Sequence, residues 1–228
     1  MRRVRHDNAG ARVTHTERLI RMLAGGRVMR SGDLTAAGVP NTVTCRAAER
    51  GLIDRIEDVA TGISIGYALP GLATDPVLVR LAATAQRHER AVLCFWSALR
   101  LHELTDETEE KYTAAVRPGL SRHATLPWVQ LIQWPDENLF RVGIEERTIL
   151  GQKVLVTDPA RTVLDCFRVA RFPSGDAHKA LRELVLRDDG GDRAVSAVSA
   201  YARHLNCYEA VEQVLVTIRS FQCATPMR

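Results

Sequence analysis

The sequence predicts an α+β protein in which an N-terminal winged helix-turn-helix precedes a mixed α/β C-terminal domain with a small sheet and flanking helices. Residues 31–52 have the spacing of two short helices joined by a tight turn, and the segment after them alternates like a β-hairpin. Beyond residue 75, alternating segments lie between amphipathic ones, which indicates a second core built from strands and helices. We therefore expect a basic arm over residues 1–13, a winged helix-turn-helix over 14–72 and a C-terminal domain over 73–228.

The helix-turn-helix prediction depends on residues that start and stop helices. Ser31 is the expected N-cap of the first helix, and Gly38 suits the left-handed conformation that ends it. Pro40 opens the second helix, and Gly51 ends it. Val43 and Ala47 have the four-residue spacing of one inward face, which we centre on Val43, and the opposite face is available for recognition.

That opposite face carries short side chains that suit contacts with base edges, namely Asn41, Thr42, Thr44 and Cys45. Arg46 and Arg50 are expected nearer the core, with their stems on apolar surface and their guanidinium groups reaching phosphates. Arg30 and Ser31, at the start of the first helix, complete the expected set of DNA contacts here. A plain two-helix interaction module is the alternative interpretation.

The charge of the chain is unevenly distributed. The formal net charge is +4, and residues 1–74 hold 11 Lys or Arg against 7 Asp or Glu, so all of the excess lies in this first part. Arg2, Arg3 and Arg5 form a basic arm with little apolar content. Positive charge concentrated beside a helix-turn-helix favours phosphate binding, and the arm either contacts DNA or is an inert tail.

The hairpin after the second helix is expected to form a wing around a turn at Thr61 and Gly62. Arg55 is the wing's one basic candidate for a phosphate contact, whereas Glu57 and Asp58 place negative charge near the tip. Because these negative charges repel the phosphates of DNA, we expect the tip itself to contact DNA weakly.

Pairs of Asp and Pro mark two helix starts in the C-terminal domain, at Asp75-Pro76 and Asp158-Pro159. Ser97 is expected to cap a short helix there, and Thr16 to cap the first helix of the N-terminal domain. Three further amphipathic helices follow the second Asp-Pro helix. Strands are expected near residues 91–96, 111–117, 129–134, 141–149 and 154–157.

Composition excludes several classes of protein. No apolar run approaches the roughly 18 residues of a membrane span, and the arginine-rich start lacks the apolar core of a signal peptide, so we expect a cytoplasmic protein. The five cysteines are widely spaced and contain no C-x-x-C pair, which favours reduced thiols. We expect no metal site and no cofactor.

Several segments resemble the AbiEi family of type IV antitoxins. They are SALRLHELT at 97–105, YTAAVRPG at 112–119 and GIEERTILGQKVLVTDPARTVLDCFR at 143–168. The hairpin ending in YALPG at 67–71 fits the same pattern. These segments occur in the family's order and span most of the chain from about residue 18 to 183. The block at 143–168 is the most specific, because many unrelated regulators have a helix-turn-helix.

The resemblance implies a bacterial antitoxin whose winged helix represses its own operon and whose C-terminal domain counteracts a nucleotidyltransferase toxin without a stable complex. It implies double-stranded promoter DNA with inverted repeats as the target, and hence a dimer of the protein on one site. Within the matched block, the residues it singles out for antitoxin function are Asp158, Arg161, Thr162 and Asp165. The alternative roles are a helix start for Asp158 and a solvent-facing position for Asp165.

Two other classes of function deserve comparison. A stand-alone winged-helix repressor with a ligand-sensing C-terminal domain is the alternative, and a metabolite that alters operator affinity would favour it. An enzyme is disfavoured: a PD-(D/E)xK nuclease needs a carboxylate two residues before Lys153, where this chain has Gly151. The Gly-Ser and paired carboxylates of a nucleotidyltransferase are missing as well. Ser97 and His102 could pair as nucleophile and base, but they lack the third partner that would orient the base. We therefore interpret His102 as a surface residue.

Overall fold

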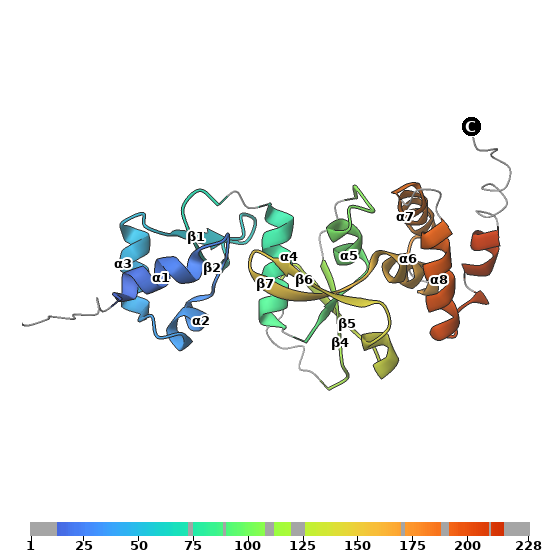
Figure 1. The fold of residues 1–228 in the computed structure, drawn as a ribbon, viewed down its shortest axis with the longest axis horizontal. Helices are drawn as coiled ribbons and strands as arrows, with labels where there is room; N and C mark the ends of the chain where they lie inside the picture. Colours follow the sequence, from blue (N-terminus) through green and yellow to red (C-terminus); the bar gives the residue numbers. More distant parts are fainter. Residues whose placement is uncertain are drawn as a thin grey trace, which may run out of the picture. The chain divides into compact units, whose positions relative to one another are not determined.

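The computed structural model describes residues 13–72, 75–88, 90–107, 112–119, 126–169, 172–187, 192–209 and 211–216, and these form an α+β protein (Figure 1). The chain divides into two compact units, Met1–Val79 and Arg80–Arg228. The sequence predicts a domain boundary before helix α4 (Pro76–Arg87), at residues 72–73, whereas the division between the two units falls inside that helix. The arm residues Arg2, Arg3 and Arg5 lie outside the described residues.

The first unit has the predicted winged-helix fold. Three helices precede an antiparallel two-stranded sheet, and Met29 forms a bridge with Tyr67 on the other side of the second strand. Apolar side chains from all three helices and the following loop share one core, in which Leu19, Leu34 and Ile53 are buried. The elements are α1 (His15–Leu23), α2 (Ser31–Ala36), α3 (Asn41–Glu49), β1 (Asp54–Glu57) and β2 (Ser64–Ala68).

The N-terminal caps of α1 and α2 differ from those predicted. Thr14 and Glu17 form a capping box at the start of α1, in which each side chain accepts a hydrogen bond from the other residue's backbone N–H, at 3.2 and 2.9 Å. Thr16 lies inside the helix, so its prediction as the cap is wrong. Helix α2 begins after Arg30, which makes no side-chain cap, and Ser31 is its first helical residue rather than its N-cap.

Helix α3 has the predicted ends and buries Ala47 as predicted, but the other buried residue is Thr44 and not Val43. Gly38 and Gly51 have φ angles of +83° and +68°, the left-handed conformation expected after α2 and α3. Thr44 is 1% exposed and Ala47 is 3% exposed, whereas Val43 is only partly buried. Their small side chains permit the close contact between α3 and α1. Thr44 therefore cannot reach a base edge, which corrects its prediction as a DNA contact.

The second unit contains a five-stranded mixed sheet with the strand order β5-β4-β3-β7-β6. The pairs β3 with β7 and β4 with β5 are parallel, while β3 with β4 and β6 with β7 are antiparallel. The predicted arrangement of a small sheet with helices before and after it is confirmed. The strands are β3 (Val92–Leu93), β4 (Tyr112–Val116), β5 (Val129–Gln133), β6 (Ile144–Ile149) and β7 (Gln152–Thr157).

Helix α6 lies within a group of helices in this unit and contacts α5, α7 and α8 (Figure 1). A 3₁₀ helix, η1 (Glu137–Phe140), precedes β6, and residues 211–216 are also helical. In the described part of the chain, every helix is too short or too polar to cross a bilayer. The helices are α4 (Pro76–Arg87), α5 (Trp96–Leu101), α6 (Pro159–Arg168), α7 (Ser174–Arg187) and α8 (Asp192–His204).

The start of α5 differs from the prediction. The apolar run at 91–96 forms only the two-residue strand β3, because Phe95 turns the chain with a φ of +48° and the helix begins at Trp96. Ser97 is buried inside the helix, where its Oγ accepts a hydrogen bond from the backbone N–H of Thr113 at 2.8 Å. Ser97 therefore ties α5 to β4 and is not the predicted cap.

Candidate nucleic-acid interface and the core around helix α6

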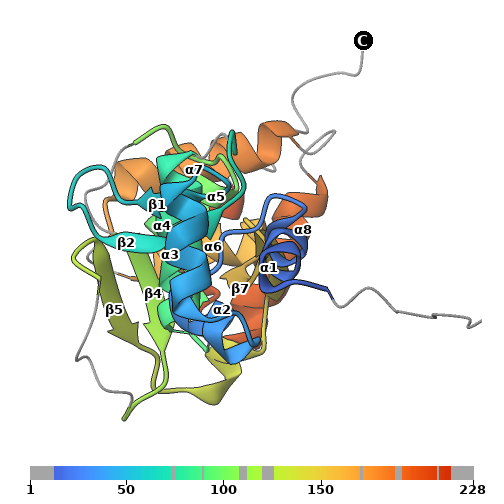
Figure 2. The same ribbon diagram turned by 90° about the vertical axis from the view of Figure 1, so that its left-hand side faces the viewer.

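The exposed face of α3 is the first candidate site. With Thr44 and Ala47 inward, a rotation of roughly 100° per residue sets the order of side chains across the outer face. Asn41 and Arg50 lie at its two margins. Figure 2 shows this helix turned toward the viewer, with α2 at its lower end. The side chains at the middle of the exposed face are Thr42, Cys45, Arg46 and Glu49.

A hollow of about 410 Å³ lies beside this face, between the N-terminal ends of α2 and α3 and the wing. Inside it, Ser31 Oγ donates a hydrogen bond to Asn41 Oδ1 at 3.0 Å. This contact fixes the orientation of the Asn41 amide and leaves its N–H groups directed elsewhere. The hollow brings together residues that the sequence predicted as DNA contacts, namely Arg30, Ser31, Asn41, Cys45 and Arg55.

Two arginines at the hollow form local ion pairs. Arg30 donates to both carboxylate oxygens of Asp33, at 2.9 Å each. Arg55 Nε lies 2.8 Å from Glu57 Oε1, and both of these side chains are largely exposed. Exposed pairs contribute little to stability, so the Arg55 guanidinium can exchange its carboxylate for a phosphate at small cost.

Arg46 and Arg50 are exposed and have no ion pair among the described residues. The expectation that their stems lie against the core is wrong, because the inward face is rotated by one residue from Val43. The same rotation moves Arg46 from the margin to the middle of the outer face. A guanidinium at that position suits guanine edges as well as phosphates.

The wing tip is less acidic than its sequence suggests. Asp58 is 4% exposed, and its carboxylate accepts hydrogen bonds from the backbone N–H and the hydroxyl of Thr61, at 2.9 and 2.8 Å. It therefore stabilises the turn, and its charge does not project toward a ligand. Val59 is 93% exposed at this tip.

Sequence reasoning missed two residues of this surface. Glu49 was left out because the face was centred on Val43, although it lies seven residues, or about two turns, after Thr42. Tyr67 lines the hollow from β2, and its part in the site depends on the folded wing rather than on local spacing. A carboxylate such as that of Glu49 can accept a hydrogen bond from a cytosine amino group.

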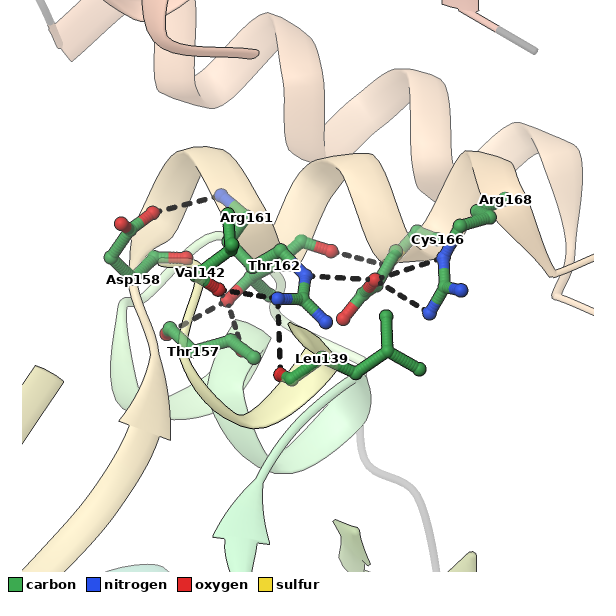
Figure 3. Close-up of polar contacts among 9 residues, drawn as sticks. Leu139, Val142, Thr157, Asp158, Arg161, Thr162, Cys166 and Arg168 are labelled. Atoms are coloured by element: carbon green, nitrogen blue, oxygen red, sulfur yellow. Dashed lines mark hydrogen bonds and ion pairs between the residues drawn. The ribbon is translucent and has the colours of Figure 1, made fainter. Parts of the chain in front are cut away.

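Helix α6 carries a buried ion pair in the second unit (Figure 3). The side chains of Arg161 and Asp165 are 0% exposed, and Arg161 Nε lies 3.0 Å from Asp165 Oδ1. Arg161 Nη1 also donates to the carbonyl oxygens of Leu139, at 3.3 Å, and Val142. Its guanidinium lies 4.9 Å from the ring centroid of Trp134. One arginine thus joins α6 to the segment that leads into β6.

Asp165 also accepts a hydrogen bond from Arg168 Nη2 at 3.1 Å, so one carboxylate serves two guanidinium groups. The alternative of a solvent-facing Asp165 is therefore wrong. Thr162 is equally buried, and its Oγ1 lies 2.7 Å from both Thr157 Oγ1 and the carbonyl oxygen of Asp158. None of Arg161, Thr162 and Asp165 has an exposed side chain with which to contact a partner.

Asp158 is the N-cap of α6, as predicted. Its Oδ1 accepts a hydrogen bond from the backbone N–H of Arg161 at 2.8 Å, and its Oδ2 accepts one from the Tyr201 hydroxyl at 2.5 Å. Burial, together with this hydrogen bond, raises the pKa of Tyr201 to about 12. The hydroxyl therefore keeps its proton near neutral pH and holds α8 to the start of α6.

Gly143 makes the close approach of β6 to α6 possible. Its φ is +64°, and a Cβ at this position would lie 2.6 Å from Arg161 Cβ. A side chain here would be strained by the backbone and would collide with the arginine of the buried pair. This explains why a glycine opens the segment 143–168 that carries the family resemblance.

Comparisons with known proteins identify no family for this chain. No protein-family profile matches the sequence, and no curated protein matches it. Among solved structures, the crystal structure of the RV2827C protein from Mycobacterium tuberculosis is similar, with 19% sequence identity and a TM-score of 0.47. The match covers 91% of this chain and 82% of that chain. This likeness assigns neither a family nor a function.

Proposed function

We propose that the protein is the antitoxin of a type IV toxin-antitoxin system of the abortive-infection kind, which represses its own operon and counteracts a nucleotidyltransferase toxin. The observation that carries the DNA-binding half is the exposed face of α3 beside the hollow. The toxin-counteracting half is supported by the resemblance of residues 143–168 to AbiEi antitoxins.

In the proposed complex, α3 enters the major groove of the promoter with Thr42, Cys45 and Arg46 toward the base edges. The Asn41 amide, held by Ser31, reads a base from the margin of this face. Phosphate contacts come from Arg50, from the arginines of the hollow and from the basic arm at Arg2, Arg3 and Arg5. Two copies bind the two halves of an inverted repeat.

The counteraction of the toxin does not run through direct contacts of Arg161, Thr162 or Asp165, because their side chains are buried. These residues preserve the fold of the second unit instead. In this proposal the protein acts in the cytoplasm, without enzymatic activity of its own and without a stable complex with the toxin.

A single substitution separates the two halves of the proposal. Arg46→Ala in the full chain removes a cation from the middle of the α3 face and should weaken promoter binding by about 1–3 kcal/mol. A promoter–reporter fusion should then lose repression, while cells that express the cognate nucleotidyltransferase toxin of this proposal should still be rescued. Arg182→Ala, which removes an exposed arginine of α7, is the charge-matched control and should preserve both activities.

Two results would count against the proposal in different ways. Full repression by Arg46→Ala would show that the α3 face does not bind the promoter. Failure of the wild-type chain to rescue cells from the toxin would remove the antitoxin function while leaving DNA binding intact.

A further inference from the structure

A second cavity lies wholly within the second unit. Its volume is about 620 Å³, which falls in the range of pockets that hold small organic molecules. It opens between the end of α5, the start of α6, the end of α7 and the first turns of α8. Its apolar wall consists of Leu101, Leu104, Pro159, Ala160, Leu184, Ala194 and Ala197.

Three arginines from three different elements line this cavity. They are Arg147 of β6, Arg187 of α7 and Arg193 of α8. The acids that line it are Glu103 and Asp158, so its charged residues carry a net positive charge. Strand β6 and the successive helices α7 and α8 thus place their arginines around one space with an apolar wall.

The contacts that the charged groups of the cavity already make leave it able to bind an anion. Asp158 is already satisfied, because its two oxygens accept hydrogen bonds from the Arg161 backbone and the Tyr201 hydroxyl. Arg193 is exposed and has no ion pair or hydrogen bond within the described residues. It is therefore the cation of the cavity with the most donors available to a ligand.

The other two arginines are held in position by the protein. Arg187 donates to the carbonyl oxygens of His102, at 2.6 Å, and Glu103, and so caps the C-terminal end of α5. Arg147 pairs with Glu145, which does not line the cavity, at 2.5 Å. Both guanidinium groups retain N–H donors beyond these contacts, and Arg187, which is held by two backbone carbonyls, loses less side-chain freedom on binding than a free arginine would.

We propose that this cavity binds a small organic anion, with a phosphate or carboxylate head on an apolar body. The head lies against Arg193, with Arg147 and Arg187 completing the cationic side, and the body lies against the apolar wall. Guanidinium groups match both kinds of head in bidentate geometry, and the wall gives no contact to an inorganic ion. The site is separate from the proposed DNA interface, because no residue of the α3 face lines it.

Calorimetric titration of the full chain with phenyl phosphate tests this site, with inorganic phosphate and benzyl alcohol as single-feature probes. Phenyl phosphate should bind with a Kd of about 0.1 to 1 mM, from its size and one charged head. Inorganic phosphate should bind several-fold more weakly, and benzyl alcohol should give no measurable heat. Arg193→Gln should weaken phenyl phosphate binding by roughly tenfold, the effect of one charge-assisted hydrogen bond.

Two further variants test whether binding depends on charges of the cavity itself. Arg182→Gln changes the charge of α7 by the same amount outside the cavity and should leave the Kd unchanged. Glu103→Gln removes an acid from the cavity rim and should tighten binding. Absence of heat from phenyl phosphate at ~10 mM, well above the expected Kd, would overturn the proposal. Equal Kd values for Arg193→Gln and Arg182→Gln would do the same. Equal binding of inorganic phosphate and phenyl phosphate would also overturn it, because the apolar wall would then play no part.

Discussion

The buried pair of Arg161 and Asp165 organises the second unit at the scale of single residues. Both charged groups are buried, which costs desolvation free energy. The ion pair, two backbone carbonyls and the face of Trp134 offset this cost. An Arg and an Asp four residues apart have the same spacing in an exposed surface pair. Sequence therefore predicted the helix but not the burial, which depends on the contact with the segment before β6.

Removing the carboxylate of this pair should be strongly destabilising. Asp165→Ala leaves the Arg161 charge buried without its partner and should lower the free energy of unfolding by about 3–5 kcal/mol. Urea unfolding followed by tryptophan fluorescence measures this, because Trp96, Trp128 and Trp134 all lie in the second unit. Glu146→Ala, which removes an exposed pair with Lys153, is the control and should leave the midpoint unchanged. Equal effects of the two variants would contradict the structural role of the buried pair.

His102 should make the second unit less stable in mild acid. It is 7% exposed rather than a surface residue, and its Nε2–H donates to the carbonyl oxygen of Thr157 at 2.7 Å. Burial lowers its pKa, so the unfolded chain takes up a proton near pH 6.5 before the folded chain does. Stability is complete above that pH and falls as the pH drops toward the folded pKa, by up to about 1.4 kcal/mol per pH unit.

The matched variant for this effect is His102→Gln, whose amide can donate to the same carbonyl but does not titrate. Its urea midpoint should change less than that of the wild type between pH 7.5 and 5.5. His88 also has a lowered pKa from burial and remains in both proteins, so it does not affect the difference. Identical pH profiles would show that His102 is not the titrating group.

At the scale of elements, the sequence predicted where helices exist better than which residues cap them. Both Thr14 and Thr16 suit an N-cap by type, and only the reciprocal bonds with Glu17 distinguish them. Likewise, Gly38 and Gly51 identified the ends of α2 and α3, whereas the face of α3 was misplaced by one residue. Thr44 and Ala47 are too small to give a clear hydrophobic period, so packing against α1 decided the rotation.

The capping box can be tested by comparing two threonines of the same helix. Thr14→Ala should destabilise α1 by about 1 kcal/mol, because it removes one of the two reciprocal hydrogen bonds. Thr16→Ala should have little effect, since no hydrogen bond of its side chain caps the helix. Amide hydrogen exchange of residues 17–23 measures the difference. Faster exchange in Thr16→Ala than in Thr14→Ala would contradict the assignment of the cap.

The rotation of α3 gives an equally direct comparison. Thr42→Val removes a hydroxyl from the outer face and should weaken binding to the promoter by about 1–3 kcal/mol while barely affecting scrambled DNA. Thr44→Val changes a side chain that is 1% exposed and should leave the affinity for both duplexes unchanged. Gel-shift titrations give these affinities. A larger loss of promoter affinity for Thr44→Val than for Thr42→Val would contradict the observed rotation of α3 and favour the rotation predicted from sequence.

At the scale of the whole molecule, the winged helix and the mixed sheet with its helices followed from periodicity, turn residues and charge. The two cavities did not, because each gathers residues from elements that are distant in sequence. The cationic side of the second cavity consists of Arg147, Arg187 and Arg193. Arg147 is far from the other two in sequence, and these two lie on different helices, so no local pattern indicates a shared site. The hollow at α3 was half predicted: its α2 and α3 residues came from one motif, whereas of the wing residues that line it only Arg55 was expected from the sequence.

We expect the first unit to recognise a specific DNA sequence through the outer face of α3. Fluorescence anisotropy of the full chain on its own promoter duplex and on a scrambled duplex of equal composition tests it most directly, at one fixed salt concentration. The promoter should bind at least roughly 10³-fold more tightly. Raising the salt should weaken both complexes, because phosphate contacts release counterions from either duplex. Equal affinity for the two duplexes would contradict sequence-specific recognition.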